Sequence, residues 1–251
     1  MTEAAKLFEQ AIDPKQYDIS PMWSINRQGK EARARELHYS SFLYPFKDKW
    51  NGGTFLDIGA GTGWLVAEAS HGGTQRAIGI DPSKTNLLTA RYRFPGITMV
   101  EATLEAYQTT ESFNNIAAIM SLCHIGNLEE AFRKLLALSD PGATIYTVVP
   151  DPDHFLQNRY GDQEVTVQKL DNGVWVTKTE TPTGPRAEIV RDPNLYTLTA
   201  VREGFVLIAE VPMPPTKILV RAVPRYAQVN GPMTHLQVYQ TSVLPSANQA
   251  Q

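Results

Sequence analysis

The chain has 251 residues, and its 23 Lys and Arg residues against 26 Asp and Glu residues give a formal net charge of −3. This length suits one large domain or one domain with an insertion, and the slightly acidic balance disfavours a nucleic-acid binder that relies on a broad cationic surface. The single cysteine, Cys123, excludes an internal disulfide framework and a multi-cysteine zinc site.

The first 50 residues are predicted to form a helical arm, with helices over 3–12 and about 26–44. The second helix carries an alternating-charge face, which is typical of a solvated surface: Arg27, Lys30, Glu31, Arg33, Arg35 and Glu36. Core packing is expected for most of the large aromatic residues of the arm, because such side chains bury large areas: Trp23, Tyr39, Phe42, Tyr44, Phe46 and Trp50.

From Gly53 onward, short apolar strands alternate with helices. Strands are predicted at 55–58, 77–80, 97–100, 116–120 and 143–149. A helix that opens at Asn127 is expected to stop at Asp140-Pro141-Gly142. Continuously apolar strands separated by helices indicate a parallel sheet covered on both faces, and right-handed crossovers then make a doubly wound α/β fold.

After residue 149 the pattern becomes β-rich. Residues 164–169 and 174–180 flank Asn172-Gly173, the strongest short hairpin signal, and 186–190 adds a strand. We expect 152–190 to be an insertion that forms a substrate cap or pairs with a second subunit in a homodimer. A helix from Asp192 with Leu195, Leu198 and Val201, strands at 205–211 and 233–239, and a disordered tail at 242–251 are predicted to follow. Residues 216–228 fit no single element.

The central motif is the glycine-rich segment Asp57-Ile58-Gly59-Ala60-Gly61-Thr62-Gly63-Trp64, between a predicted strand and a predicted helix. Open α/β sheets bind ligands at this place, and glycines there permit unusual φ angles and a close approach of the ligand. Trp64 stands where the dinucleotide fingerprint has its third glycine, and the Asp57 carboxylate would repel a pyrophosphate but attract a cation. Both features disfavour NAD and FAD.

A second acid, Asp81, ends the second predicted strand 20 residues after Gly61. A carboxylate at that place accepts the hydroxyls of a ribose in dinucleotide folds. The two acids therefore indicate a nucleoside that carries a positive group, a description that S-adenosylmethionine fits. In the structural alternatives, Asp57 caps the glycine loop and Asp81 caps the next helix together with Ser83.

On these residues the chain resembles the class I (seven-stranded, Rossmann-like) S-adenosylmethionine-dependent methyltransferases. The resemblance is strong over 50–150 and weak over 191–240, and it is carried by FLDIGAGTGWL (55–65), AIGIDPS (77–83) and SLCHIGNLEEAFRKLLALSDPGA (121–143). It implies a mostly parallel seven-stranded sheet with helices on both faces, with S-adenosylmethionine as cofactor and S-adenosylhomocysteine as product. The expected parts are an arm (1–50), a cofactor half (51–151), the insertion (152–190), the last helix and strands (191–241) and the tail.

The resemblance also implies which residues hold the cofactor. Its methionine part would be surrounded by Asp57, Gly59, Ala60, Gly61 and Gly63, with Tyr17 of the arm placed over it unless that tyrosine only packs. Asp81 would hold the ribose, and Pro82 would pack near the adenine. Ala102 stands where the family often has an acid for the adenine amino group, which leaves Thr103 and Leu104 to offer a backbone amide and an apolar wall. Ser121 would lie at the lip where the methyl group is transferred.

Two further groups are candidates for the reaction itself. His124 follows the fourth strand and is a candidate general base, unless it only orders its loop; Cys123 beside it is expected to be a bystander. Asp151 and His154 follow the fifth strand and are candidates for substrate contact, unless they belong to an exposed polar loop.

The predicted function is methyl transfer by in-line displacement to an oxygen or nitrogen of a small-molecule metabolite. The Asn/Asp-Pro-Pro-Tyr signature of adenine-N methyltransferases is absent after the fourth strand, so nucleic acid is not the expected substrate. No secretory signal or membrane-length apolar run is visible, and the five histidines lack metal-ligand spacing, so we expect a cytoplasmic protein without membrane partner or metal. The alternatives are a non-methylating S-adenosylmethionine-binding module or cyclase-like enzyme, and an RNA methyltransferase.

Overall fold

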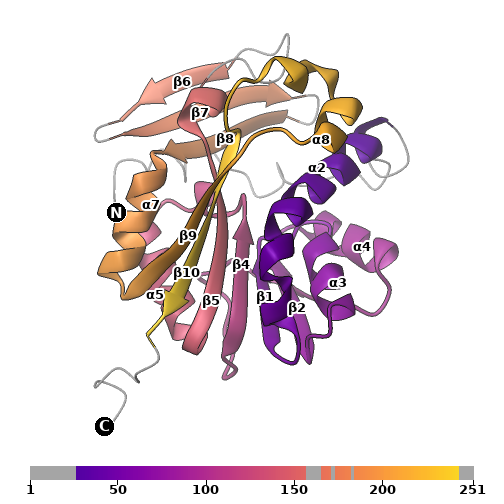
Figure 1. Cartoon of the computed structure of the whole chain (residues 1–251), viewed down its shortest axis with the longest axis vertical. Coiled ribbons are helices and arrows are strands. Elements are labelled where there is room, and N and C mark those ends of the chain that lie inside the picture. Colours follow the sequence, from indigo (N-terminus) through magenta and orange to yellow (C-terminus); the bar gives the residue numbers. More distant parts are fainter. Residues whose placement is uncertain (1–26, 157–164, 171–172, 182–183, 243–251) are drawn as a thin grey trace.

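The computed structural model describes residues 27–156, 165–170, 173–181 and 184–242 (Figure 1). Its centre is a seven-stranded sheet in the order β3-β2-β1-β4-β5-β10-β9. Strands β1 to β5 pair in parallel, and β10 runs antiparallel to both of its neighbours. The predicted doubly wound, mostly parallel seven-stranded sheet is confirmed. The strands are β1 (Thr54–Ile58), β2 (Arg76–Asp81), β3 (Thr98–Glu101), β4 (Phe113–Ile119), β5 (Ser139–Pro150), β9 (Phe205–Met213) and β10 (Thr234–Thr241).

The strand order reverses between β1 and β4, because β2 and β3 extend the sheet on one side and β4 and β5 extend it on the other. Open α/β sheets bind ligands in the crevice outside the carboxyl ends of the strands at such a reversal. The loops that follow β1, β2 and β4 all leave from this edge. The topology therefore brings the glycine loop, Asp81 and Ser121 to one place.

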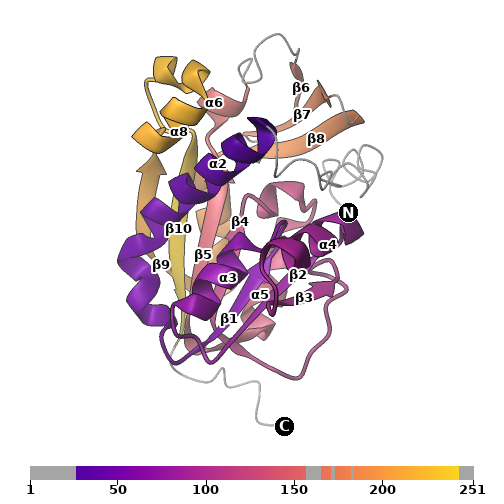
Figure 2. The same cartoon turned by 90° about the vertical axis from the view of Figure 1, so that its right-hand side faces the viewer.

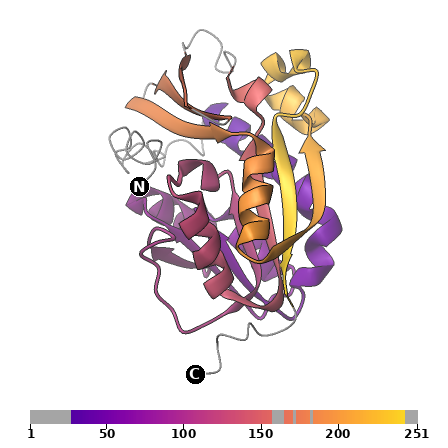
Figure 3. The same cartoon turned by 90° about the vertical axis from the view of Figure 1, so that its left-hand side faces the viewer.

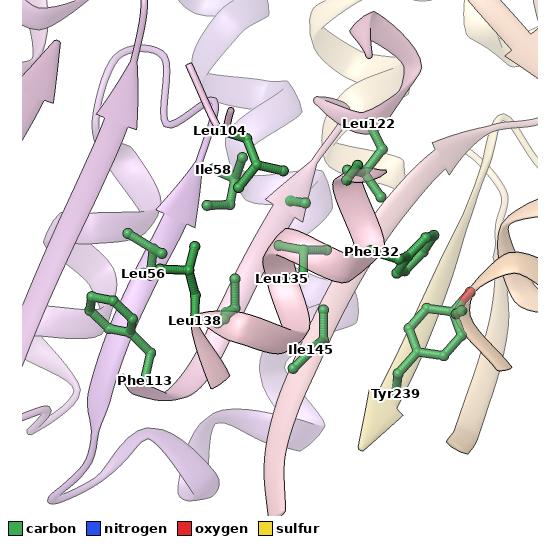
Figure 4. Packing of buried hydrophobic residues seen from close by; sticks show 14 of the residues in the cluster. Leu56, Ile58, Leu104, Phe113, Leu122, Phe132, Leu135, Leu138, Ile145 and Tyr239 are labelled. Atoms are coloured by element: carbon green, nitrogen blue, oxygen red, sulfur yellow. The ribbon is translucent and has the colours of Figure 1, made fainter. Parts of the chain in front are cut away.

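Helices cover both faces of the sheet (Figures 1 and 3). The helices α2 (Arg27–Leu43), α3 (Trp64–His71) and α4 (Lys84–Arg93) pack on one face, and α5 (Leu128–Ala137) and α7 (Pro193–Arg202) pack on the other. Figure 2 shows α2 running diagonally across its face above α3. Figure 4 shows the buried cluster to which Leu56 and Ile145 of the strands and Phe132 and Leu135 of α5 all belong. Because the central strands are buried on both sides, their sequences are continuously apolar.

A small antiparallel sheet lies at the end of the molecule toward which β4 points (Figure 1). Its strands are β6 (Val165–Lys169), β7 (Val174–Thr181) and β8 (Gly184–Arg191). β6 and β7 pair antiparallel up to Lys169 and Trp175, the strand pairing that the predicted hairpin requires. The predicted β-rich segment after the fifth strand is therefore present, and β8 contacts the short 3-10 helix η4 (Leu122–His124) that follows β4. One helical turn, α6 (Pro152–Phe155), connects β5 to the small sheet.

The segment 216–228, for which the sequence gives no single expectation, forms a short helix, α8 (Lys217–Ala222), and the 3-10 helix η5 (Pro224–Gln228). The side chain of Thr216 caps α8 by accepting a hydrogen bond from the Leu219 N–H. A small apolar cluster joins α8 to α2 and contains Ala34, Leu219, Val223, Tyr226 and Met233. The helical arm is thereby packed on the domain at two places, the sheet and α8.

Most of the described aromatic residues of the arm pack as expected, since Trp50 is buried and Tyr39, Phe42 and Phe46 pack against the core. Tyr44, in the 3-10 helix η3 (Tyr44–Trp50), differs from them and is 72 % exposed. Two other sequence predictions were wrong. Glu36 of the expected solvated face is only 6 % exposed, because Arg93 pairs with it. Asp140-Pro141-Gly142 lies inside β5, since an irregular register accommodates the extra residues.

The helix predicted from Asp192 is confirmed as α7, with Asp192 as its N-cap, although two of its apolar residues face solvent. Leu198 and Val201 are each 53 % exposed, because α7 turns Tyr196 and Ala200 toward the sheet instead. The predictions for helix 3–12, Trp23 and the tail from 243 onward lie outside the described residues.

Acid is expected to destabilise the protein through His38 of α2, whose ring faces Thr216 at the start of α8. The ring is 1 % exposed, its Nδ1 lies 3.4 Å from Thr216 Oγ1, and burial lowers its pKa from 6.5 to about 4. The unfolded chain binds this proton at a higher pH than the folded chain, so the contribution of neutral His38 is lost as the pH falls from 6.5 toward 4. The total loss is about 3 kcal/mol in the free energy of unfolding.

Urea unfolding at neutral pH and at pH 4 measures this loss. The variant His38→Gln cannot titrate at this position and is expected to lose less stability on acidification than the parent protein. The exposed His71→Gln serves as the matched control. Equal losses in the parent protein and in His38→Gln would contradict the assignment.

Candidate functional site

The glycine loop connects β1 to α3 and turns sharply at three glycines. Gly59, Gly61 and Gly63 have φ angles of +67°, +52° and +75°, a region that side-chain-bearing residues rarely adopt. The Ala60 N–H donates to the Ile80 carbonyl, and the Gly63 N–H donates to the Ala60 carbonyl, both at 2.9 Å. The loop is therefore a fixed backbone turn at the carboxyl end of β1.

Two of these glycines allow close packing, and the third faces open space. A Cβ atom on Gly59 would lie 2.6 Å from the Cβ of Ser121, and one on Gly63 would lie 2.6 Å from Cδ1 of Ile97. A Cβ atom on Gly61 would meet no heavy atom of the described structure within 4 Å. Gly61 thus presents bare backbone to an open space at the strand reversal, as a ligand-binding glycine should.

Asp81, the last residue of β2, is bound to the glycine loop. Its Oδ2 accepts a hydrogen bond from the Gly61 N–H at 2.8 Å, and its Oδ1 accepts from the Ser83 N–H at 2.9 Å. Asn86 Nδ2 donates to the same Oδ1 at 3.2 Å. These contacts fix the orientation of the Asp81 carboxylate beside the glycine loop. The N-cap of α4 is Ser83 itself, whose side chain accepts from the Asn86 N–H.

Asp57 lies next to Asp81 and is slightly more buried, at 3 % against 5 % exposed. Burial raises the pKa of its carboxyl well above 3.8, and the neighbouring charge of Asp81 raises it further. A cationic ligand group near the pair would stabilise the ionised form. The two neighbouring carboxyl groups therefore form an acidic pair beside the glycine loop that would attract a cation.

The end of β4 completes this side of the site. Met120 has a φ of +56°, a strained conformation for a residue with a side chain, and Ser121 follows it against Gly59. The hydroxyl oxygen of Ser121 is buried and has no hydrogen-bond partner in the described structure. An orphaned buried hydroxyl at a glycine loop is a place for a ligand atom.

The residues expected near the adenine differ in their exposure. Pro82 and Thr103 are exposed, and Thr103 Oγ1 accepts a hydrogen bond from the Ala106 N–H. Leu104 is 3 % exposed and belongs to the same buried cluster as Ile58 and Leu122, so its side chain is part of the core (Figure 4). The Thr103 hydroxyl is therefore already used in a hydrogen bond within its own turn, and the Leu104 side chain contributes to the core.

The loop after β4 is held in place by an arginine that sequence reasoning missed. Arg191, the last residue of β8, is buried and donates to the carbonyls of Leu122 (3.3 Å), Ile125 (2.7 Å) and Gly126 (3.1 Å). His124 is half-buried in this loop, whereas Cys123 is buried and donates from Sγ to the Met120 carbonyl. The small sheet thus fixes the loop that carries the candidate base.

The predicted substrate residues follow β5, and one of them has an unexpected partner. Asp151 Oδ2 lies 2.8 Å from Nε2 of His235, the second residue of β10, and Asp151 Oδ1 accepts from the His154 N–H. The His154 ring packs near Phe155 and Tyr226. His235 lies 84 positions from Asp151, so no local spacing in the sequence could have revealed the pair.

Tyr17 lies outside the described residues. Within the described ranges, no group of three or more His, Cys, Asp or Glu side chains is arranged to hold a metal ion. No helix in the same ranges is long and apolar enough to span a membrane.

Comparison with known proteins gives consistent matches. The methyltransferase domain family matches residues 25–181. An uncharacterized methyltransferase from Alkaliphilus oremlandii is 30 % identical over 138 residues, which cover 55 % of this chain and 62 % of that relative, less than two thirds of its length. An S-adenosylmethionine dependent methyltransferase structure from Mesorhizobium loti aligns with a TM-score of 0.61 and 19 % identity, over 79 % of this chain and 97 % of that one.

A second solved structure is the S-adenosylmethionine-bound amino pentose methyltransferase of calicheamicin biosynthesis from Micromonospora echinaspora. It aligns with a TM-score of 0.56 and 15 % identity, over 84 % of this chain and 94 % of that one. At these identities, both structures share the fold with this chain.

Proposed function

The chain belongs to the methyltransferase domain family, and from this premise we propose that it transfers the methyl group of S-adenosylmethionine to an oxygen or nitrogen of a small molecule. The observation that carries the proposal is the buried acid pair beside the glycine loop, Asp57 and Asp81. S-adenosylmethionine combines an amino group and a sulfonium, which are cations, with a ribose that offers two hydroxyls. Asp57 suits the cationic methionine part, and Asp81 suits the ribose hydroxyls.

The described residues also fit the rest of this cofactor. Gly61 leaves room at the loop, and Ser121 offers a buried hydroxyl without a partner. We assign the methionine part to Asp57, Gly59, Ala60, Gly61 and Gly63 and the ribose to Asp81, with Pro82, Thr103 and Leu104 bordering the adenine. When bound, S-adenosylmethionine supplies an electrophilic methyl group on a good leaving group. The chain must then mainly align the acceptor and exclude water.

The acceptor side is proposed to lie between the loops after β4 and β5. His124 stands on the first loop and is our candidate proton acceptor, while Asp151 and His154 on the second are candidates for binding the acceptor. The pairing of Asp151 with His235 adds a further acid–base group at this edge. The small sheet contacts η4 and closes this end, which suits a small acceptor, as does the fold shared with an amino pentose methyltransferase.

Isothermal titration with S-adenosylmethionine tests the cofactor site. The variant Asp57→Asn is expected to bind about 10-fold more weakly or worse, because the carboxylate no longer attracts the cation. The same variant is expected to unfold at a higher temperature, because the cost of burying a charge beside Asp81 disappears. The exposed Asp48→Asn should change neither quantity.

Incubation with methyl-labelled S-adenosylmethionine and a metabolite extract tests the transfer. Label in small products that pass an ultrafiltration membrane supports the proposal. Binding without any labelled product would leave a binding module or a cyclase-like enzyme. Label found only in RNA would instead assign the protein to the RNA methyltransferases.

A further inference from the structure

A buried ion pair next to the glycine loop joins α2, α4 and the loop itself. Arg93, the last residue of α4, contacts both carboxylate oxygens of Glu36 on α2, with Nη1 to Oε1 at 2.6 Å and Nη2 to Oε2 at 2.8 Å. Thr62 of the glycine loop lies between them, donating from Oγ1 to Glu36 Oε1 at 3.2 Å and accepting from Arg93 Nη1 at 2.6 Å. We name Glu36, Arg93 and Thr62 the loop clasp.

The geometry of the clasp is that of a strong interaction. Two parallel contacts between a guanidinium and a carboxylate fix orientation as well as distance. The side chain of Glu36 is 7 % exposed and that of Arg93 is 17 % exposed, so water screens the pair little. Arg33 also donates to Glu36 Oε2, at 3.2 Å, but its own side chain is 57 % exposed and lies on the solvent side.

The position of Thr62 connects the clasp to the ligand site. Thr62 stands between Gly61 and Gly63, the two glycines with left-handed φ angles that follow Ala60. The neighbouring Gly61 N–H donates to Asp81, so the loop is held by an acid at Gly61 and by the clasp at Thr62. Because glycines have no side chains, Thr62 is the polar side chain through which neighbouring helices reach residues 59–63.

We propose that Glu36 and Arg93 are positioning residues for the cofactor, which act by holding Thr62 and thereby the backbone of Gly61 and Gly63 in the binding conformation. This inference rests on the proposed function, because it takes the glycine loop as the S-adenosylmethionine site. In this proposal α2 does more than pack on the sheet, because the Glu36 carboxylate contacts both Arg93 of α4 and Thr62 of the glycine loop.

The variants Thr62→Val and Thr62→Ser distinguish this role from the alternative that Glu36 and Arg93 only attach α2 to α4. Valine keeps the shape of threonine and removes the hydroxyl, whereas serine keeps the hydroxyl. We expect Thr62→Val to weaken S-adenosylmethionine binding about 10-fold in isothermal titration and Thr62→Ser to bind within about 2-fold of the parent protein. Glu36→Gln should weaken binding in the same direction, and Arg33→Gln, on the solvent side of the same carboxylate, should not.

Amide hydrogen exchange at Gly61 and Gly63 in the cofactor-free protein supplies the second readout. Faster exchange in Thr62→Val than in Thr62→Ser supports the proposal. Unchanged exchange, or a lowered unfolding temperature with unchanged affinity for S-adenosylmethionine, overturns it. If the parent protein itself fails to bind S-adenosylmethionine, the proposed function and the cofactor role of the clasp both fail, while the exchange rates still decide whether the clasp fixes the loop.

Discussion

Replacing Asp81 by asparagine is expected to weaken S-adenosylmethionine binding about 100-fold or more, because the two charge-assisted hydrogen bonds that we propose Asp81 accepts from the ribose would be lost at once. The change also disturbs the loop. The Asp81 carboxylate accepts from the N–H groups of Gly61 and Ser83, and an amide has only one oxygen to offer them. One of these donors would then face an NH2 group, which favours a displaced loop.

Isothermal titration and thermal unfolding together measure both consequences. Asp140→Asn is the matched control, since Asp140 also accepts hydrogen bonds, from Ser112 and Asn114, but lies at the amino end of the strands. The control is expected to bind the cofactor like the parent protein. Unchanged affinity in Asp81→Asn would mean that Asp81 shapes the loop and does not hold the ribose.

The fold and the cofactor loop could be predicted because their determinants are local. The run from Asp57 to Trp64 carries a strand end, the glycine turn and a helix start within eight residues, and each has a recognisable residue pattern. Buried parallel strands also leave an unmistakable apolar signature. Class I methyltransferase fold and family membership therefore followed from the sequence, and both are confirmed.

The contacts that support the site were not predictable, because their partners are distant in the chain. Glu36 and Arg93 are 57 positions apart, and Arg191 is 69 positions from Leu122, whose carbonyl it binds. A charged residue on a helix has the same sequence signature whether it meets water or a buried arginine. Glu36 was therefore expected on a solvated face, and only the packing of α4 against α2 corrects this. The division into parts and the individual site assignments stay predictions.

Replacing Gly61 by alanine is expected to abolish most cofactor binding, with an affinity about 100-fold lower, while the protein remains folded. A Cβ atom at this position meets no atom of the described chain within 4 Å, so the free protein bears only the backbone strain of an alanine at a φ of +52°. That strain is about 1 kcal/mol. The methyl group would stand in the open space that we assign to the methionine part of the cofactor.

Gly52→Ala separates the two effects, because Gly52 has a φ of +73° and its Cβ would also meet nothing within 4 Å of the described chain. Gly52 precedes β1 at the amino end of the sheet, opposite the proposed site. Both variants should therefore lose a similar amount of unfolding free energy, but only Gly61→Ala should lose affinity in isothermal titration. If both retain the affinity of the parent protein, the space beside Gly61 does not hold the cofactor. If both lose it equally, backbone strain rather than occupied space is the cause.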